Sequence, residues 1–132
     1  MLRRDLITAE IQKLAQVLAK IMGLKFEGKL EESETLFKES ILKEFEITEE
    51  DLLTISNHEF NSLLFSRDFP AEKLDMLSQF LYADITPISK THRNALIAEK
   101  LLTIYEMLEE QHRIISMINL DRQKKIQQYF NP

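Results

Sequence analysis

The segment Gly28–Ser40 is the part of the chain that most constrains its fold. A glycine precedes an amphipathic stretch that carries Ser33, then Phe37 four residues later, then Ser40 three residues after that. On a helix these three positions share one face, because residues three and four apart lie one above the other. Small side chains on that face let a second helix approach closely, and the aromatic ring fills the space beside them. The segment therefore predicts a packed helical hairpin with Gly28 at its corner.

The composition is that of a folded chain that buries a core without cross-links. Of the 132 residues, 44% are hydrophobic and 30% are charged, as in ordinary globular domains. The chain has no cysteine, which excludes a disulfide framework, a thiolate metal site and a cysteine nucleophile. We therefore expect a single all-helical domain over residues 1–132, in a reducing compartment such as the cytoplasm.

Charge and hydropathy bear on the class of partner. Asp5 and Glu10 interrupt the apolar run that a secretion signal needs, and no apolar stretch is long enough to span a bilayer. We therefore expect no membrane insertion. The net charge of −5 opposes binding to nucleic acid, because a polyanion attracts basic surfaces.

The charge is distributed unevenly along the chain. Residues 31–51 carry nine acidic and two basic residues, a net charge of −7, whereas residues 112–132 carry four basic residues and one acidic residue, a net charge of +3. Two solvated helix faces would explain this pattern. It also fits electrostatic complementarity, either within one molecule or between two copies, and the sequence leaves both arrangements open.

Apolar residues recur at helical spacing through most of the chain, and the few glycines and prolines fall at segment ends. The pattern predicts six to seven helices arranged as antiparallel hairpins. Residues 1–45 form the first hairpin, residues 46–86 form short capped helices and a connecting helix, and residues 87–130 form a C-terminal hairpin. The expected helices cover residues 2–27, 30–45, 49–54, 57–65, about 70–85, 88–109 and 113–129. One continuous bent helix through residues 110–112 remains an alternative.

Two capping boxes mark sharp turns in the middle of the chain. Thr48 precedes Asp51 by three residues, and Ser56 precedes Glu59 by three, so each pair can satisfy the free amides of a helix start. Apolar side chains define the inner faces that we expect to be buried. They are Ile7, Ile11, Leu14, Leu18 and Ile21 in the first helix, Leu30, Phe37, Ile41 and Phe45 in the second, Ile114, Ile118 and Ile126 in the last, and most of the eight phenylalanines.

Three further motifs suggest chemistry but lack the context that it needs. Residues 23–30 match the glycine and lysine spacing of a phosphate-binding loop, yet Leu30 stands where the magnesium-binding hydroxyl belongs and a helix, not a strand, precedes the loop. Glu109 and His112 form a single Glu-x-x-His step, whereas di-iron bundles need two such pairs. Two short consecutive helices can imitate a helix-turn-helix, but acidic residues lead into them. We expect no enzyme activity, cofactor or metal. A metal-binding protein or enzyme and a nucleic-acid-binding regulator are the alternatives.

The first hairpin resembles one tetratricopeptide repeat, a helical hairpin of about 34 residues. In that family the second helix carries a small, an aromatic and a small residue at the spacing of Ser33, Phe37 and Ser40, after a turn glycine like Gly28. The residues at the signature positions of the first helix depart from the family pattern, and a second copy around Ser116 matches poorly. The whole chain also resembles an uncharacterised family of small bacterial all-helical proteins. These resemblances imply a bacterial cytoplasmic protein with a repeat-like fold.

The sequence therefore predicts a small protein–protein interaction or scaffold module without catalysis. Two stacked hairpins leave an apolar face open, since repeat arrays usually need three units to cover their core. The partner is then an unknown protein or a second copy in a homodimer. The candidate interaction residues are Leu2, Leu6, Ile7, Ile11, Phe65, Phe69, Tyr129 and Phe130.

Overall fold

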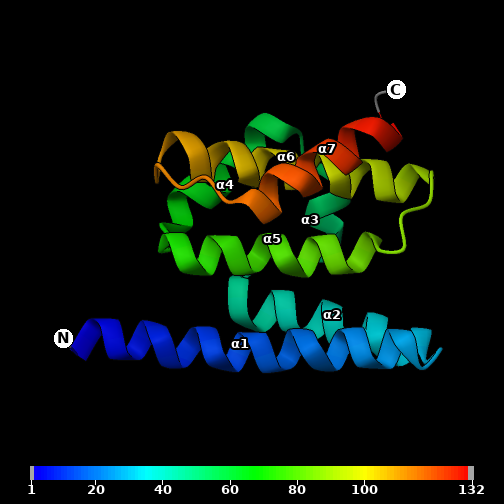
Figure 1. Ribbon diagram of the computed structural model, residues 1–132, viewed down its shortest axis with the longest axis horizontal. Coiled ribbons are helices and arrows are strands. Elements are labelled where there is room, and N and C mark those ends of the chain that lie inside the picture. Colours follow the sequence, from blue (N-terminus) through cyan, green and yellow to red (C-terminus); the bar gives the residue numbers. More distant parts are fainter. Residues whose placement is uncertain (1, 131–132) are drawn as a thin grey trace.

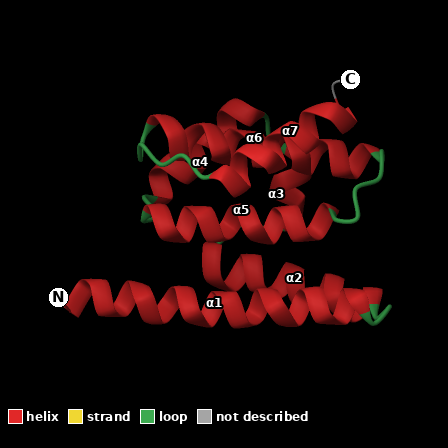
Figure 2. Ribbon diagram, in the orientation of Figure 1, coloured by secondary structure: helices red, strands yellow, loops and turns green. Residues whose placement is uncertain are grey.

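A computed structural model describes the backbone of residues 2–130 and the side chains of residues 3–130. Every regular element in this range is an α-helix (Figure 2), which confirms the predicted all-α class. The seven helices are α1 (Leu2–Phe26), α2 (Leu30–Phe45), α3 (Glu49–Thr54), α4 (Asn57–Arg67), α5 (Ala71–Ile85), α6 (His92–Glu110) and α7 (Met117–Phe130).

Helices α1 and α2 form the predicted antiparallel hairpin. Gly28 adopts the left-handed backbone conformation that closes α1, with φ of 80°. The Ser33 hydroxyl donates a hydrogen bond to the carbonyl oxygen of Ile21 at 3.0 Å, and both Ser33 and Phe37 are buried. The small hydroxyl therefore lets α2 lie directly against the backbone of α1, as the sequence pattern predicts.

The remaining helices stack on this hairpin in layers around α5. Helix α5 lies between the α1–α2 hairpin and α6 (Figure 1), and it contacts all three of those helices. Eight of its 15 residues are buried. Helix α6 packs on α5 from the other side and also contacts α3, α4 and α7. Since α5 and α6 supply most of the buried side chains, they are the centre of the hydrophobic core.

Both predicted capping boxes are present. The Thr48 hydroxyl accepts a hydrogen bond from the amide of Asp51 at 3.0 Å, and the Asp51 carboxylate accepts one from the amide of Thr48 at 3.1 Å. Ser56 and Glu59 make the same reciprocal pair at the start of α4. Local side-chain chemistry therefore sets both starts, which is why the sequence located them correctly.

The boundaries of the last two helices differ from the prediction. Helix α6 begins at His92 rather than at residue 88, because the Thr91 hydroxyl caps the amide of Asn94. Helix α7 begins at Met117 rather than at residue 113, because Arg113 adopts a left-handed conformation with φ of 57° that interrupts helical geometry. The two helices are separate and antiparallel (Figure 1), so the alternative of one bent helix is wrong.

Some side chains that we expected in the core are exposed. Leu30 lies on the rim of a pocket beside Phe37 and does not enter the core. Phe26, in the last turn of α1, points into solvent. Ile114 and Ile118 are also exposed, since the later start of α7 changes which residues face α5.

Candidate interaction surface

The corner between α6 and α7 turns apolar residues outward. The amide of Gln111 still bonds to the carbonyl of Met107 at 2.9 Å, and the amide of Ile114 reaches back to the carbonyl of Leu108 at 2.9 Å. Between them the left-handed Arg113 reverses the chain. The corner is therefore held by backbone hydrogen bonds, and the side chains that follow it extend away from the end of α6.

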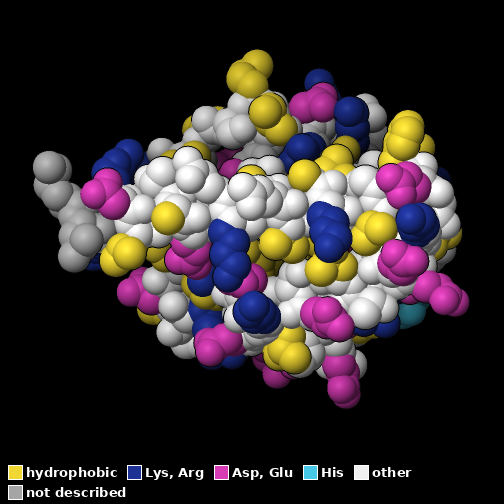
Figure 3. Space-filling model, turned by 90° about the horizontal axis from the view of Figure 1, so that it is seen from below, with side chains coloured by type: hydrophobic (Ala, Val, Ile, Leu, Met, Phe, Trp, Pro, Cys, Tyr) yellow, Lys and Arg dark blue, Asp and Glu magenta, His cyan; other side chains and the backbone are white. Residues whose placement is uncertain are grey.

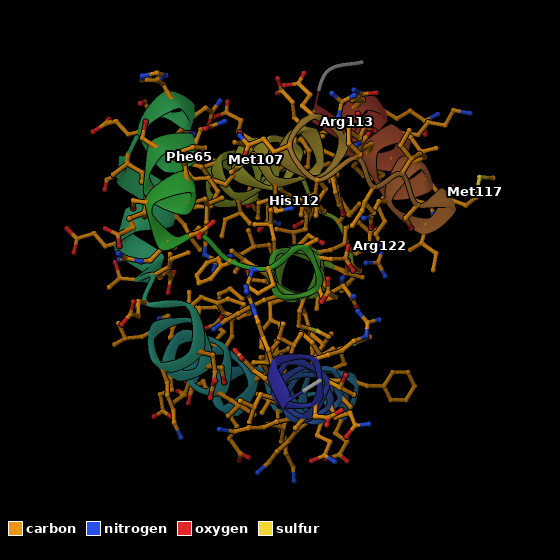
Figure 4. All side chains as sticks on the ribbon, turned by 90° about the vertical axis from the view of Figure 1, so that its left-hand side faces the viewer. Phe65, Met107, His112, Arg113, Met117 and Arg122 are labelled. Atoms are coloured by element: carbon orange, nitrogen blue, oxygen red, sulfur yellow. The ribbon has the colours of Figure 1, made fainter. Side chains whose placement is uncertain are left out.

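Helix α7 attaches to the bundle along a narrow face. Its two buried residues are Asn119 and Ile126, seven positions apart, which corresponds to two helical turns. The Asn119 side-chain amide donates to the Asp75 carboxylate on α5 at 2.8 Å. The Arg122 guanidinium lies 4.5 Å from the centre of the Tyr82 ring, and Figure 4 shows it between α7 and α5. This polar anchor fixes which face of α7 points outward.

The outward face of α7 and the corner before it form the largest group of exposed apolar side chains that are close in sequence. Ile115 is 70% exposed, Met117 is 83% exposed and Ile118 is 63% exposed. Met117 points away from the bundle in Figure 4. Five residues, which we call the C-terminal apolar surface, make up this group: Ile114, Ile115, Met117, Ile118 and Leu120. A concentration of this kind on a folded chain marks a contact surface more often than an isolated exposed side chain does.

Basic residues border this apolar surface. Arg113 precedes it, and Lys124 lines a shallow groove of about 440 Å³ together with Met117 and Leu120. Neither Arg113 nor Lys124 forms an ion pair with another described residue, whereas Lys125 pairs with Asp121 at 3.1 Å. The surface therefore combines apolar side chains with two unpaired cations beside it, while the acid that lines the groove, Asp121, is paired with Lys125.

The residues that the sequence singled out for interaction lie in separate places. Leu6 is 63% exposed on α1, but Ile7 and Ile11 beside it are partly buried. Seen from the α1 side, apolar side chains are scattered among charged ones (Figure 3). The side chain of Leu2 lies outside the described residues. Helix α1 therefore presents no continuous apolar face over the side chains that are described.

The aromatic candidates are divided in the same way. Phe65 is exposed on α4, while Phe69 packs edge-on against Phe45 with the ring centres 5.9 Å apart. Tyr129 is partly exposed and Phe130 packs against the core. Ile115 and Met117 were therefore not predicted, and Ile114 and Ile118 were expected in the core. The available signal was four apolar residues among the five residues 114–118, directly after a corner without glycine or proline.

A second concave site lies between the α1–α2 hairpin and the loop after α5. This pocket of about 300 Å³ is lined by Lys25, Asp84 and Arg93 among others. The Lys25 ammonium donates to the carbonyl oxygens of Ala83 and Asp84, both at 2.8 Å, and Arg93 donates to the Asp84 carboxylate at 2.8 Å. Burial lowers the pKa of Lys25 and raises the pKa of Asp84.

The charged groups of this pocket bind one another. Arg93 also pairs with Glu49 at 3.2 Å, and Glu49 pairs with Lys38 at 3.1 Å. The Asn94 amide donates to the carbonyl and the hydroxyl of Ser89. Because these donors already have acceptors within the protein, the arrangement ties α1, α3, α5 and α6 together. We interpret it as a structural network and not as a ligand site.

The histidines and acids of the sequence are not gathered into a metal site. Among the described residues, no group of three or more histidine, aspartate or glutamate side chains has the geometry to hold an ion. His112 lines a cavity of only about 50 Å³ with Phe65 and Met107 (Figure 4), whereas His58 and His92 begin α4 and α6.

Comparison with known proteins identified no relative of this chain. No protein-family model, curated protein or solved structure matches the chain. Within residues 2–130, each helix is too short or too polar to cross a bilayer.

Proposed function

We propose that this chain is a small protein–protein interaction module without catalytic activity, and that it binds its partner through the C-terminal apolar surface. The observation that carries the proposal is the exposure of that surface on a helix that buries only two of its 14 residues. Full burial of a large aliphatic side chain contributes about 1.5–3 kcal/mol. A partner that covers several of these side chains gains enough free energy for stable binding.

The charge and the cysteine content support the rest of the proposal. A net charge of −5 disfavours nucleic acid as the partner, and the absence of cysteine suits the cytoplasm. The mutual hydrogen bonds of the Lys25–Asp84–Arg93 pocket leave no evident group to act on a substrate. These observations favour an interaction module over the alternatives of an enzyme and a nucleic-acid-binding regulator.

A matched pair of variants tests the site of binding. Ile118→Asp places a charge on the C-terminal apolar surface, and Leu6→Asp places the same charge on α1. Both positions are 63% exposed, so neither substitution is expected to unfold the chain. Proteins that co-purify from the host would be quantified for the natural chain and for each variant.

We predict opposite results for the two variants. We expect Ile118→Asp to lose the specific partner and Leu6→Asp to retain it. Retention of the same proteins by Ile118→Asp would refute the proposal. Loss of the partner in Leu6→Asp alone would indicate that the binding site lies on α1, where the sequence also predicts candidate interaction residues.

A further inference from the structure

The acidic helix α2 and the basic helix α7 lie on opposite sides of the molecule. Helix α2, which begins the acidic stretch, lies beside α1 in the lower layer, whereas α7 lies beside α6 in the upper layer, with α5 between the two layers (Figures 1 and 4). The complementarity that the sequence left open is therefore not satisfied within one molecule. A second copy of the chain can bring the two regions together.

A groove that is complementary to the C-terminal apolar surface lies between α1 and the acidic helix α2. Leu24 of α1 and Leu36 of α2 line a depression of about 440 Å³, with Glu31, Glu32 and Glu39 along it. These three carboxylates are exposed, and none forms an ion pair with another described residue. We call the groove formed by Lys20, Leu24, Glu31, Glu32, Thr35, Leu36 and Glu39 the acidic groove.

The two surfaces are complementary in chemistry. The groove beside α7 offers Met117 and Leu120 next to an unpaired Lys124, and its one acid, Asp121, pairs with Lys125. The acidic groove offers two leucines and three unpaired glutamates, with Lys20 as its one basic residue. Burial of the apolar side chains would stabilise such a contact, and the opposite charges around them would orient the two molecules. We propose, resting on the proposed function, that the partner is a second copy of this chain, whose acidic groove receives α7 in a head-to-tail contact.

A head-to-tail contact has a consequence that a symmetric dimer lacks. Because the two joined surfaces are different, one molecule of a pair keeps its acidic groove unused and the other keeps its α7 surface unused, so further copies can add. The contact therefore produces a growing chain or a closed ring rather than a simple dimer. Its rim pairs are exposed to solvent, so added salt weakens it.

Charge reversal at each surface tests the inference. One variant, Arg113→Glu with Lys124→Glu, makes the α7 side acidic. The other, Glu31→Lys with Glu39→Lys, makes the groove basic. All four side chains are exposed. A control, Arg3→Glu with Arg4→Glu on the first turn of α1, makes the same change in net charge as the first variant away from both surfaces.

Sedimentation velocity across the micromolar range provides the measurement. We expect the natural chain and the control to gain mass with concentration, and each reversed variant alone to lose more than about tenfold in association constant. We expect an equimolar mixture of the two reversed variants to associate again, since the acidic α7 of one then meets the basic groove of the other. Unchanged melting temperatures would show that the variants remain folded.

Three results would overturn the inference. The natural chain could remain monomeric throughout the range. The groove variant could associate like the natural chain while the α7 variant does not, which would indicate a symmetric contact between two α7 helices. The mixture could fail to recover. None of these results bears on whether Ile118→Asp loses a different partner, so the proposed function is judged separately by that variant.

Discussion

At the scale of single residues, the two glycines show that the effect of adding a side chain depends on the backbone conformation at its position. Gly23 lies inside α1, and Gly28 closes the helix with φ of 80°. A methyl group added at either position would meet no atom within 4 Å. Packing is therefore the same in both cases, and only the backbone conformation differs.

We predict opposite effects for alanine at these two positions. Gly23→Ala should stabilise the protein by about 0.5–1 kcal/mol, because alanine restricts the unfolded chain and favours the helix. Gly28→Ala should destabilise it by about 1–2 kcal/mol, because a side chain disfavours the left-handed conformation. Urea unfolding curves of the two variants check the signs. A stabilising Gly28→Ala would contradict the account of the corner.

Lys100 is a buried charge without an acidic partner among its hydrogen bonds. Its side chain on α6 is almost fully buried, and its ammonium donates one bond to the Asn57 side-chain oxygen at 3.3 Å. Burial lowers the pKa of Lys100 from its usual value of 10.5. In the pH range just below 10.5 the unfolded chain therefore binds more protons than the folded chain, and stability rises with pH there.

We predict that Lys100→Met raises the free energy of unfolding by about 1 kcal/mol near neutral pH, because it removes the cost of burying a polar group. The gain should shrink as the pH approaches 10.5, where the natural lysine becomes neutral in both states. Chemical unfolding at about pH 7 and about pH 10 tests this dependence. A variant that is less stable at both values would show that the Asn57 bond outweighs the burial.

At the scale of elements, one buried network joins helices that the sequence cannot relate to one another. Arg93 of α6 links Asp84 of α5 with Glu49 of α3, and Lys25 of α1 caps the last carbonyls of α5. The Asp84 side chain is only 8% exposed. Burial raises its pKa, and the bond from Arg93 acts in the opposite direction.

We predict that Arg93→Met destabilises the protein by about 3 kcal/mol near neutral pH, because it leaves the Asp84 carboxylate buried without its cation. The folded-state pKa of Asp84 lies above the unfolded value, so its contribution to stability falls as the pH rises above 3.8. Loss of Arg93 raises that pKa further. The variant should therefore lose less stability at about pH 4 than at about pH 7.

Lys29→Met is the matched control for this network, because its ion pair with Glu27 at 3.5 Å is exposed on both sides. It should change the free energy of unfolding by no more than about 0.5 kcal/mol. Thermal melts of both variants at the two pH values would show the difference. An equal loss for Arg93→Met at both pH values would exclude Asp84 as the cause.

At the scale of the whole molecule, the layers differ in how firmly they are held. Helix α5 buries eight of its 15 residues and α6 buries ten of its 19, whereas α7 buries two of its 14. Local opening is easiest where few apolar contacts must be broken. The helix that carries most of the proposed binding surface is therefore less firmly fixed to the core than α5 and α6 are.

We predict that backbone amides of α7 exchange with deuterium faster than those of α5 and α6. Ile126→Ala should accelerate exchange in α7 further and leave protection in α5 nearly unchanged, because Ile126 is the one buried aliphatic side chain of that helix. Hydrogen exchange read by mass spectrometry tests both statements. Loss of protection throughout the chain would show that α7 is instead a cooperative part of the core.

The sequence by itself determined the elements whose signals are local. The boxes at Thr48 and Ser56 join residues three positions apart, and the pattern of Ser33, Phe37 and Ser40 that predicted the hairpin uses the same helical spacing. The hydrogen bond from Ser33 to Ile21 reaches only twelve positions back, across the corner at Gly28. The all-α class follows from the same periodicity. These features could be predicted without knowing how the helices stack.

Only the tertiary structure decided which apolar side chains stay in solvent. The face of α7 is set by Asn119 bonding to Asp75, 44 positions earlier in the chain, and by a left-handed Arg113 that moved the helix start. The periodicity of Ile114 and Ile118 is compatible with either face, since a helix shows an apolar stripe whether a core or a partner covers it. The resemblance to a tetratricopeptide repeat remains a prediction, because it rests on the local spacing of residues. The separation of the acidic groove from α7, in contrast, follows from the way in which whole layers of helices stack.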